Sequence, residues 1–551
     1  MSSKQTALAE TKQFRSTSWN VWLFLAVLTP FTIILLFWHD NLHSVFSYWP
    51  EWNASTEKLG PLVRSYHLET GVRWINPDGG RWRVMFTCNG QTPCSILYAK
   101  EGDIVKLSVK SDIYTQSSIH LSGIGHKQTV GPWNDGTAGL SQGLAGALYV
   151  APSPDRPRPY HLITNDTLEL RQINQAEREI QHLIIQSHQH HDTVWKLLRM
   201  RAEGSEYYCY NYILVNVKGR VHAVNQSMIT STGRNLIKMA AFNHQVCQMK
   251  AARRARQTMR SSKPKAGVRL DAEPGDYAIR ISSTSVLQNL HCYAVLRYPA
   301  KRLPQYGEPM ALPPVAPGLI CVLPDGSTQP NCSTAEGQLL PPYPPQPPPS
   351  AGKHYAGMAD FTFRLAAGSQ ASKTEKYVPE YFLNEKPWQL YHGSMLPLLF
   401  HAPNETLVKP IIGNLPLCYI IDLIIENQIN ETIPLYKHGD PSWFLGSGGQ
   451  QRFPGNTVQD AIDSDSKSLN LQDPALVIVH DLPALGWSVL RFKVTSQQAT
   501  IIHAAKLRYF ALGMSVPILE GITEETPIKI PESVVNRPHV EFKPAHDGIF
   551  G

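Results

Sequence analysis

Histidine and cysteine side chains give this 551-residue chain its main capacity for metal or redox chemistry. The densest histidine group is the run His188-Gln189-His190-His191, and neighbouring imidazoles are common ligands of transition metals. None of the eight cysteines belongs to a Cys-x-x-Cys pair, so the most specific zinc pattern is absent from the sequence. The histidine run is therefore only a hypothesis for a metal site, because nothing in its spacing supplies further ligands.

The positive charge of the chain is concentrated in one stretch. The net charge is +7, and residues 250–265 alone carry seven cations. That stretch contains no aromatic residue, whereas binding of single-stranded nucleic acid combines cations with aromatic stacking. We therefore expect a solvated helix or loop here and no nucleic-acid partner.

Short strands are expected to form most of the chain. From Gly60 onward, apolar or alternating runs are broken by Gly, Pro, Asn and Asp, which is typical of antiparallel sheets. Helical spacing of apolar residues is confined to stretches such as 175–185 and 193–201. The sequence predicts a mainly β fold, with its clearest strands at 81–87, 103–109, 277–282 and 292–298.

A proline-rich segment separates two parts of the chain. Prolines become dense between Pro304 and Ser350 and culminate in residues 341–349, a composition that favours an extended polyproline spacer. A chain of this length with 42% apolar residues is long enough for about three domains. We interpret residues 303–352 as a linker; docking of a proline-binding module is the less common alternative.

An apolar segment near the N-terminus is long enough to cross a membrane. Residues 21–38 contain no charge, which suits a helix spanning a hydrocarbon core of roughly 30 Å. A cleaved signal peptide is the alternative, but the run exceeds the usual length of about 7–15 residues and no small-x-small cleavage site follows. We expect a single-pass membrane protein with residues 1–20 cytoplasmic and the bulk of the chain luminal or extracellular.

Glycosylation sequons agree with this placement. Six asparagines precede a residue followed by Ser or Thr, namely Asn53, Asn165, Asn225, Asn331, Asn404 and Asn430. In an oxidising compartment, cysteines can form disulfides. Cys88/Cys94 and Cys321/Cys332 are close in sequence, although spacing alone does not fix the pairing.

The first part of the chain carries motifs of a known family. Residues 67–83, with Ile75-Asn76-Pro77-Asp78-Gly79, together with residues 102–103, 118–124 and 133–136, resemble the first domain of ascomycete laccases. Residues 151–185 are similar to the beginning of the second domain of these proteins.

The C-terminal part carries two further motifs. Residues 433–449 and 477–514 resemble, in order and spacing, the two copper motifs near the family's C-terminus. Over most of its length the chain therefore resembles laccase-type multicopper oxidases, in particular those of pigment and secondary-metabolite synthesis.

This resemblance implies three cupredoxin-like β-sandwiches, which we assign to residues 60–152, 153–302 and 353–545, the first two truncated. It also implies copper as the cofactor, with a mononuclear copper that takes electrons from phenols and a trinuclear cluster that passes them to dioxygen. A blue mononuclear copper needs two imidazoles and a thiolate, and the cluster is held by His-x-His pairs whose alternate residues share a strand face.

Few of these ligands stand at the matching positions. The first motif reads His120-Leu121-Ser122-Gly123 where the family has His-Trp-His-Gly, the third ends in His438-Gly439, and the fourth begins at His503. His120, His438 and His503 are thus the surviving candidate metal ligands. An isolated imidazole binds copper weakly, so we expect copper not to be fully bound.

The mononuclear positions are changed as well. They read Ile433, Ala504 and Tyr509 where the family has His, Cys and His, while Met514 keeps the axial place. Without the thiolate no blue copper is expected, and no catalytic or further cofactor-binding residue is assigned.

Two segments are shorter than in the family. The chain runs from Gly143 directly to Leu144, where the family has a Tyr-His-Ser-His segment, and strands are missing near residues 250–265. Wrongly assigned exons or a decaying gene would explain both gaps.

The family has no ligands at residues 188–191, and Asp135 matches an acidic residue that helps protons reach the cluster, although an Asp-Gly turn also explains it.

Two functions remain open. By resemblance the chain is an oxidoreductase that oxidises or couples phenolic polyketides. The alternative is a copper-free protein that binds phenolic small molecules or assists an active oxidase as its partner, because a fold does not dictate its chemistry.

Overall fold

The structure is a computed structural model that describes part of the chain. The described residues are 62–77, 82–113, 142–162, 164–178, 182–193, 210–216, 275–282, 291–298, 340–351, 358–372, 378–388, 398–400, 411–464 and 468–529, with single positions 119, 121, 123, 180, 195 and 532. Contacts divide the chain into residues 1–62 and residues 63–551. The expected membrane helix at 21–38 lies outside the described residues, and no described helix is long and apolar enough to span a membrane.

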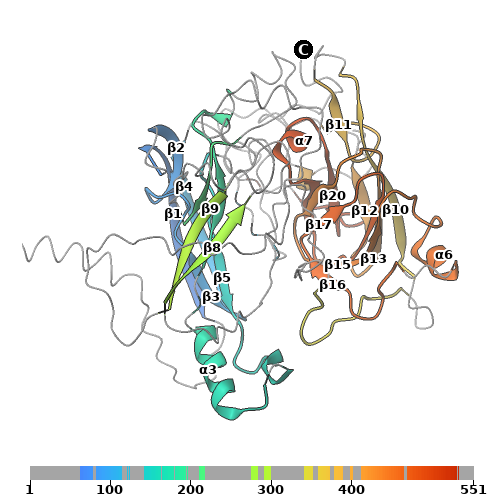
Figure 1. Ribbon diagram of the computed structural model, residues 1–551. Helices are drawn as coiled ribbons and strands as arrows, with labels where there is room; N and C mark the ends of the chain where they lie inside the picture. The colour runs from blue at the N-terminus through green and yellow to red at the C-terminus, as the bar shows by residue number, and fades with distance from the viewer. Residues whose placement is uncertain are drawn as a thin grey trace, which may run out of the picture. The chain divides into compact units, whose positions relative to one another are not determined.

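The N-terminal described strands form small sheets. Strand β1 (Val63–Ile75) pairs antiparallel with β2 (Arg83–Cys88) and parallel with β4 (Ile104–Ser111), and β3 (Leu97–Lys100) pairs parallel with β5 (Leu148–Ala151) (Figure 1). These strands follow the alternating runs of the sequence, and two of the four predicted strands correspond to β2 and β4.

The middle of the chain contains two hairpin-like pairs. Strands β6 (Ile185–His188) and β7 (Tyr212–Val215) are antiparallel, as are β8 (Gly275–Ser282) and β9 (His291–Tyr298). The side chains of Ile213 and Val215 are buried and pack against Ile281, which joins the two pairs. The predicted strands at 277–282 and 292–298 are confirmed by β8 and β9.

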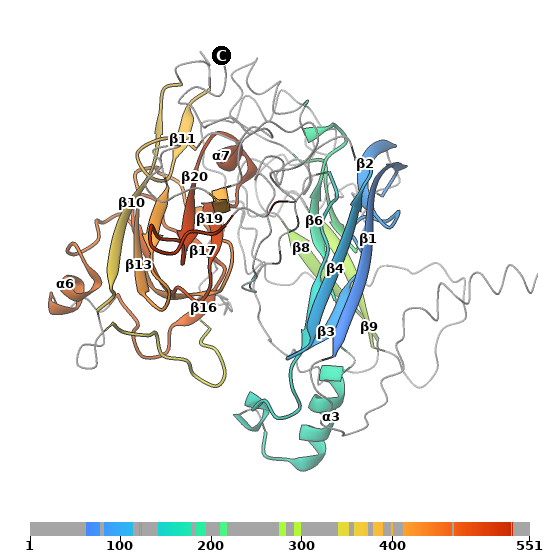
Figure 2. The same ribbon diagram turned by 180° about the vertical axis from the view of Figure 1, so that it is seen from behind.

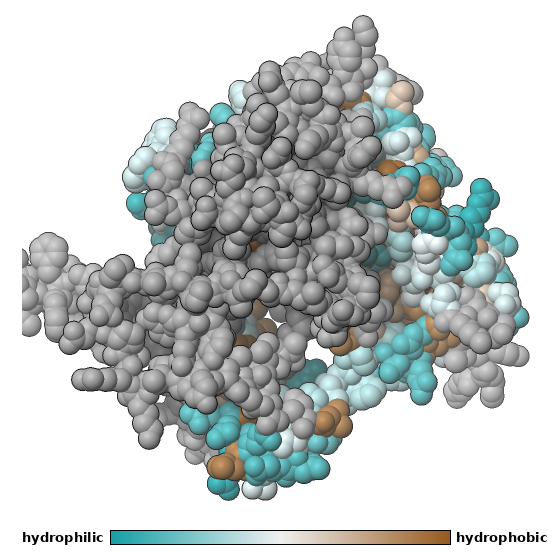
Figure 3. All heavy atoms as spheres, viewed as in Figure 1, coloured by the Kyte–Doolittle hydropathy of each residue, from teal (hydrophilic) through white to brown (hydrophobic). Residues whose placement is uncertain are grey.

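One predicted helix is displaced. Helix η1 (Pro159–Leu162) is followed by α3 (Thr167–Arg178), whereas the helical pattern predicted residues 175–185. Asp166 sets the start, because its Oδ1 accepts from Leu168 N at 3.0 Å as an N-cap does. The prediction was wrong beyond Arg178, because Ile185 pairs with Val215 in a sheet instead. Figure 3 shows mostly hydrophilic residues in the region of α3, with some hydrophobic ones among them. Leu162 and Leu168 are exposed apolar side chains of η1 and α3.

The C-terminal part is a two-sheet sandwich (Figure 2). One sheet has the order β11 (Glu380–Phe382), β10 (Phe361–Gln370), β13 (Ile420–Asn427), β18 (Trp487–Lys493), β15 (Ser442–Gly448) and β16 (Ala475–Val477). The other has the order β12 (Ile412–Leu415), β20 (Ser515–Glu520), β19 (Gln498–Ala504), β14 (Ile433–Lys437) and β17 (Val479–Leu482). Short helices η6 (Leu398–Phe400), α6 (Val458–Asp463) and α7 (Leu507–Ala511) complete this part.

The core of this sandwich explains its continuous apolar strands. On β13, Leu423 and Ile425 belong to the large cluster between the sheets, whereas Ile424 packs on the other face with Val458 of α6 and with Trp487. Both faces of β13 are therefore covered, which is why its sequence is an apolar run and not an alternation. At roughly 25 cal/mol per Å² of apolar surface, such burial is the main stabilising term.

The end of the proline-rich segment contacts this sandwich. Residues 340–351 contain no helix or strand. Because prolines have no backbone N–H to donate, this segment bonds to the sandwich through carbonyl oxygens, which accept. Trp443 Nε1 donates to Gln346 O at 2.9 Å, and Arg491 Nη1 donates to Pro349 O at 3.2 Å. Arg491 also forms a buried bidentate ion pair with Asp422, which holds its guanidinium in place. Residues 346–349 are therefore bonded to a fixed side chain of the sandwich.

Candidate functional site

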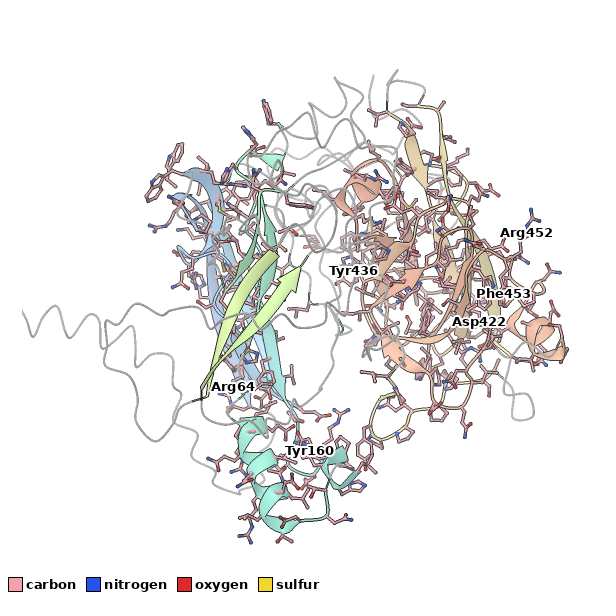
Figure 4. The ribbon with its side chains drawn as sticks, in the orientation of Figure 1. Arg64, Tyr160, Asp422, Tyr436, Arg452 and Phe453 are labelled. Carbon is pink, nitrogen blue, oxygen red and sulfur yellow. The ribbon has the colours of Figure 1, made fainter. Side chains whose placement is uncertain are left out.

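Two of the three candidate metal-ligating histidines meet in the five-stranded sheet. His438 follows β14 and His503 lies on β19, and these strands pair antiparallel with Tyr436 opposite His503. The Nε2 atoms of His438 and His503 are 2.9 Å apart, and both residues are buried. Tyr436 is labelled in Figure 4 at this sheet. His120 lies outside the described residues.

The hydrogen-bond directions within the pair follow from one carbonyl group. His503 Nδ1 lies 2.8 Å from Ala504 O, and a carbonyl oxygen only accepts, so Nδ1 carries the proton. Burial lowers the pKa of His503 to about 4, although the bond to Ala504 opposes this, so the ring is neutral at neutral pH. His503 Nε2 is then an acceptor, and His438 Nε2 donates to it.

Aromatic rings enclose the pair. Phe510 stacks on His503 with ring centroids 4.0 Å apart, and the Tyr436 ring lies 4.1 Å from that of His438. Among the described residues, no three His, Cys, Asp or Glu side chains gather closely enough to hold a metal ion. Within that part of the chain the pair is thus two imidazoles bonded to each other in an aromatic setting.

The four positions matched to the mononuclear copper motif also come together. Ile433, Ala504, Tyr509 and Met514 are each at most 1% exposed and belong to the cluster between the sheets. Backbone hydrogen bonds join three of the four, because Ala504 N donates to Met514 O and Met514 N donates to Tyr509 O. The Tyr381 ring stands edge-on to Tyr509 at 4.6 Å. Their shared surroundings are those of a packed core.

A carboxylate anchors the polar side of this cluster. Glu431 Oε2 accepts from the Tyr509 hydroxyl at 2.6 Å and from Arg508 Nη2 at 2.8 Å. Its other oxygen accepts from Lys506 Nζ, which also donates to Thr432 O at 3.0 Å. Burial raises the pKa of Tyr509, so the phenol keeps its proton and donates it to the carboxylate.

Sequence reasoning missed this network of Glu431, Lys506, Arg508 and Tyr509. Glu431 stands two residues before one motif position, and Lys506 and Arg508 stand beside another. Opposite charges flanking two motifs were a usable signal. Burial lowers the pKa of Lys506, while the Glu431 carboxylate acts in the other direction.

A second charged group lies wholly inside the sandwich. Lys437 Nζ is 3.2 Å from Glu520 Oε1, and both side chains are 1% exposed. Thr500 Oγ1 and Gln498 Nε2 also donate to this carboxylate, at 2.6 Å and 3.0 Å. Lys437 Nζ lies 4.3 Å from the centre of the Phe492 ring. Lys437 sits between Tyr436 and His438, so the third motif supplies a buried ion pair beside the histidines.

The histidine run at 188–191 has a different setting. His188 ends strand β6 and is buried, and the His191 ring stacks on Trp195 at 4.7 Å. The carbonyl oxygens of Gln189 and His191 accept from Arg83 Nη1, which ties this segment to β2.

Of the sequons, Asn165 and Asn430 are exposed, while the other four asparagines and Asp135 lie outside the described residues.

Comparison with known proteins gives a consistent result. Residues 69–147 and 388–524 match two family models described as multicopper oxidase. A laccase of Pestalotiopsis fici is 25% identical over 594 aligned positions, covering 88% of this chain and 96% of the relative. Because the alignment is longer than the chain, this relative has segments without a counterpart here.

A second relative and a solved structure agree. A multicopper oxidase of Phaeosphaeria nodorum is 22% identical, covering 84% of this chain and 91% of the relative. The crystal structure of the laccase from Botrytis aclada superimposes with a TM-score of 0.50 and 12% identity, covering 88% of this chain and 93% of that one. This likeness supports a cupredoxin-like, mainly β fold.

Proposed function

We propose that this chain, which contains multicopper oxidase domains and is a distant homologue of fungal laccases, works without the mononuclear copper of that family. In this proposal it is a binding or auxiliary protein for phenolic small molecules in secondary metabolism, alongside an active oxidase. The observation that carries the proposal is the packed cluster at the mononuclear positions.

The residues in that cluster do not fit a blue copper. Such a site needs two imidazoles and a thiolate, because the covalent copper–sulfur bond sets the redox behaviour. Ile433 and Ala504 have no donor atom, and the Tyr509 hydroxyl is already bonded to Glu431. Only the Met514 thioether remains, and it is a weak ligand by itself. No oxidation step is therefore assigned through this position.

The quality of the surrounding core supports a maintained protein over a decaying one. Buried charges are tolerated only when they are paired and hydrogen-bonded, and random substitution would leave many of them alone. Glu431 receives three donors, and Glu520 receives Lys437, Thr500 and Gln498. Both buried carboxylates beside the motif positions are therefore satisfied.

The test is a coupled assay with the full-length chain. Purified protein is mixed with a simple phenol and dioxygen, with added copper, alone and with a competent laccase. We expect no turnover by the chain itself and a changed distribution of coupling products when the laccase is present. Turnover by the chain alone, or unaltered products in the mixture, would contradict the proposal. Bovine serum albumin at equal concentration controls for nonspecific adsorption of phenols.

We also propose that the protein is a membrane-anchored glycoprotein, with residues 21–38 as the anchor and the rest luminal or extracellular. The apolar length of this segment and the exposure of Asn165 and Asn430 support this. Endoglycosidase digestion of protein from a fungal host should lower its apparent mass, and carbonate extraction should leave it in the membrane pellet. An unchanged mass or release by carbonate would refute the respective part.

A further inference from the structure

Strand β2 ends in a tight hairpin that turns the chain back on itself. Cys88 N donates to Gln91 O at 2.8 Å, and Gln91 N donates to Cys88 O at 3.0 Å. Asn89 and Gly90 between them have φ values of 49° and 76°, the left-handed geometry that Asn-Gly turns adopt. The residues that follow the turn are therefore directed back toward the end of β2.

Two cysteine side chains interact beside this turn, that of Cys88 at the end of β2 and that of Cys94 after the turn. Cys88 is 2% exposed and Cys94 is half-buried, and the Cys88 thiol is close enough to influence the ionisation of Cys94. Both are free thiols in the structure. Cys94 is fixed from its other side as well, because its N–H donates to Ala145 O at 2.7 Å. The backbone of each cysteine is thus fixed by a hydrogen bond to another part of the chain.

We propose that Cys88 and Cys94 form a redox site in which the two thiols are converted to an intrachain disulfide by thiol–disulfide exchange with a small-molecule disulfide. Sequence spacing left this pair as one of several possibilities, whereas the interaction between the two thiols in the structure selects it. The inference is independent of the proposed function, because it involves no residue of the copper motifs.

The exchange has two steps with a balanced outcome. Cys94 is the more exposed thiol, so its thiolate attacks one sulfur of the oxidant and releases one small thiol. The Cys88 thiolate then attacks the Cys94 sulfur, which forms the intrachain bond and releases the second small thiol. Two protein thiols are oxidised and one small disulfide is reduced to two thiols, with both protons passing to the products.

Burial and the Cys88 thiol raise the pKa of Cys94, so little thiolate is present at neutral pH. Because only the thiolate attacks, we expect slow formation without a catalyst and faster formation as the pH rises.

The bond would also fasten the segment that returns at residue 142. Phe86 N donates to Gln142 O at 3.0 Å, and Thr92 Oγ1 donates to Gly143 O at 2.8 Å. Gly146 lies so close to Cys94 that an added Cβ would stand 3.0 Å from the Cys94 Cβ. Residues 142–146 therefore pack against the turn and the residues that flank it. A disulfide between Cys88 and Cys94 would keep these flanking residues from separating.

The test is peptide mapping of the full-length protein after incubation with oxidised glutathione at mildly alkaline pH. The exchange is stopped with acid, the protein is unfolded in denaturant, and unreacted thiols are alkylated with N-ethylmaleimide near neutral pH before the protein is cut with trypsin. Residues 84–100 form one tryptic peptide that contains both cysteines. We expect this peptide without alkyl groups and lighter by two hydrogen atoms than the dithiol. Reduction before alkylation should restore two alkyl groups.

Cys418 is the matched control, because it is exposed and unpaired among the described cysteines. It should carry glutathione, which shows that the oxidant acted. In the Cys88→Ser variant, Cys94 should be recovered as its glutathione adduct. Recovery of two alkyl groups on peptide 84–100 while Cys418 is modified would overturn the proposal, as would a stable glutathione adduct at Cys94 of the wild-type chain or a bond from either residue to another cysteine.

Discussion

The Nε2 atoms of His438 and His503 are 2.9 Å apart, and the His438 N–H donates to the one nitrogen of the neutral His503 ring that has a lone pair for a metal ion. A metal ion would have to separate the rings and would find no third described ligand beside them. This relationship makes the neutral form of His503 part of the folded state.

The first prediction concerns acid stability. An unfolded histidine takes up its proton near pH 6.5, whereas folded His503 does so near pH 4, so the unfolded chain binds more protons between these values. The contribution of His503 to the free energy of unfolding is therefore fully present above about pH 6.5. It is lost as the pH drops toward 4, by roughly 3 kcal/mol at full extent. Urea unfolding of wild type and His503→Gln across this range measures the difference in slope.

His480 titrates in the same direction, because burial lowers its pKa to about 3. Its Nε2 lies 3.0 Å from Ser488 Oγ, so it is a second buried histidine with a different partner. We expect His503→Gln and His480→Gln each to remove part of the acid sensitivity. Equal slopes in wild type and His503→Gln would contradict the neutral histidine pair.

A second prediction concerns Glu431. Glu431→Gln removes the negative charge that Lys506 and Arg508 share, and breaking such a buried pair costs about 3 kcal/mol. Tyr509→Phe removes one hydrogen bond to the same carboxylate and should cost about 1–2 kcal/mol. Chemical denaturation measures both.

The exposed ion pair between Arg156 and Glu101 is the control for Glu431. Glu101→Gln should change the free energy of unfolding by no more than about 1 kcal/mol, because solvent screens surface pairs. If Glu431→Gln were as mild as Glu101→Gln, the network would not be a stabilising replacement for a metal site.

A third prediction uses the buried pair of Lys437 and Glu520. Lys437→Leu leaves Glu520 as an unpaired buried charge, and we expect a loss of about 3–5 kcal/mol. The double variant Lys437→Leu with Glu520→Leu should recover most of this loss, because apolar residues can replace a buried pair at little cost. A double variant that is no more stable than the single one would show that packing, not charge, dominates there.

A fourth prediction restores the motif. The triple variant Ile433→His, Ala504→Cys and Tyr509→His supplies the two imidazoles and the thiolate, with Met514 already in place. With added copper it should develop the blue absorption of a copper–thiolate bond, at reduced stability because Glu431 loses its tyrosine partner. The matched control Ile433→His with Tyr509→His lacks the thiolate and should stay colourless. A colourless but folded, copper-loaded triple variant would show that these positions do not converge as described.

Part of this picture was readable from the sequence. Alternating runs predicted β2, β4, β8 and β9, because half-buried strands impose that pattern locally. The helix was displaced because the Asp166 cap and the pairing of Ile185 with Val215 outweigh apolar spacing.

The polar groups of the site were not readable. Glu431 and Lys506 are 75 positions apart and meet only through the pairing of β14 with β19. Lys437 and Glu520 are 83 positions apart and meet because β14 and β20 both pair with β19. Opposite charges beside two motifs were the available hint, but no local pattern pairs residues so distant in sequence, so the family motifs indicated where the site lies but not what fills it.

The most direct measurement of the central claim is the copper content and visible spectrum of the purified wild-type chain after loading with copper and removal of weakly bound metal. We expect no blue copper–thiolate absorption and no stoichiometric copper, because a branched aliphatic side chain, a methyl group and an engaged phenol occupy the ligand positions at Ile433, Ala504 and Tyr509. A stoichiometric blue centre in this polypeptide would contradict that account.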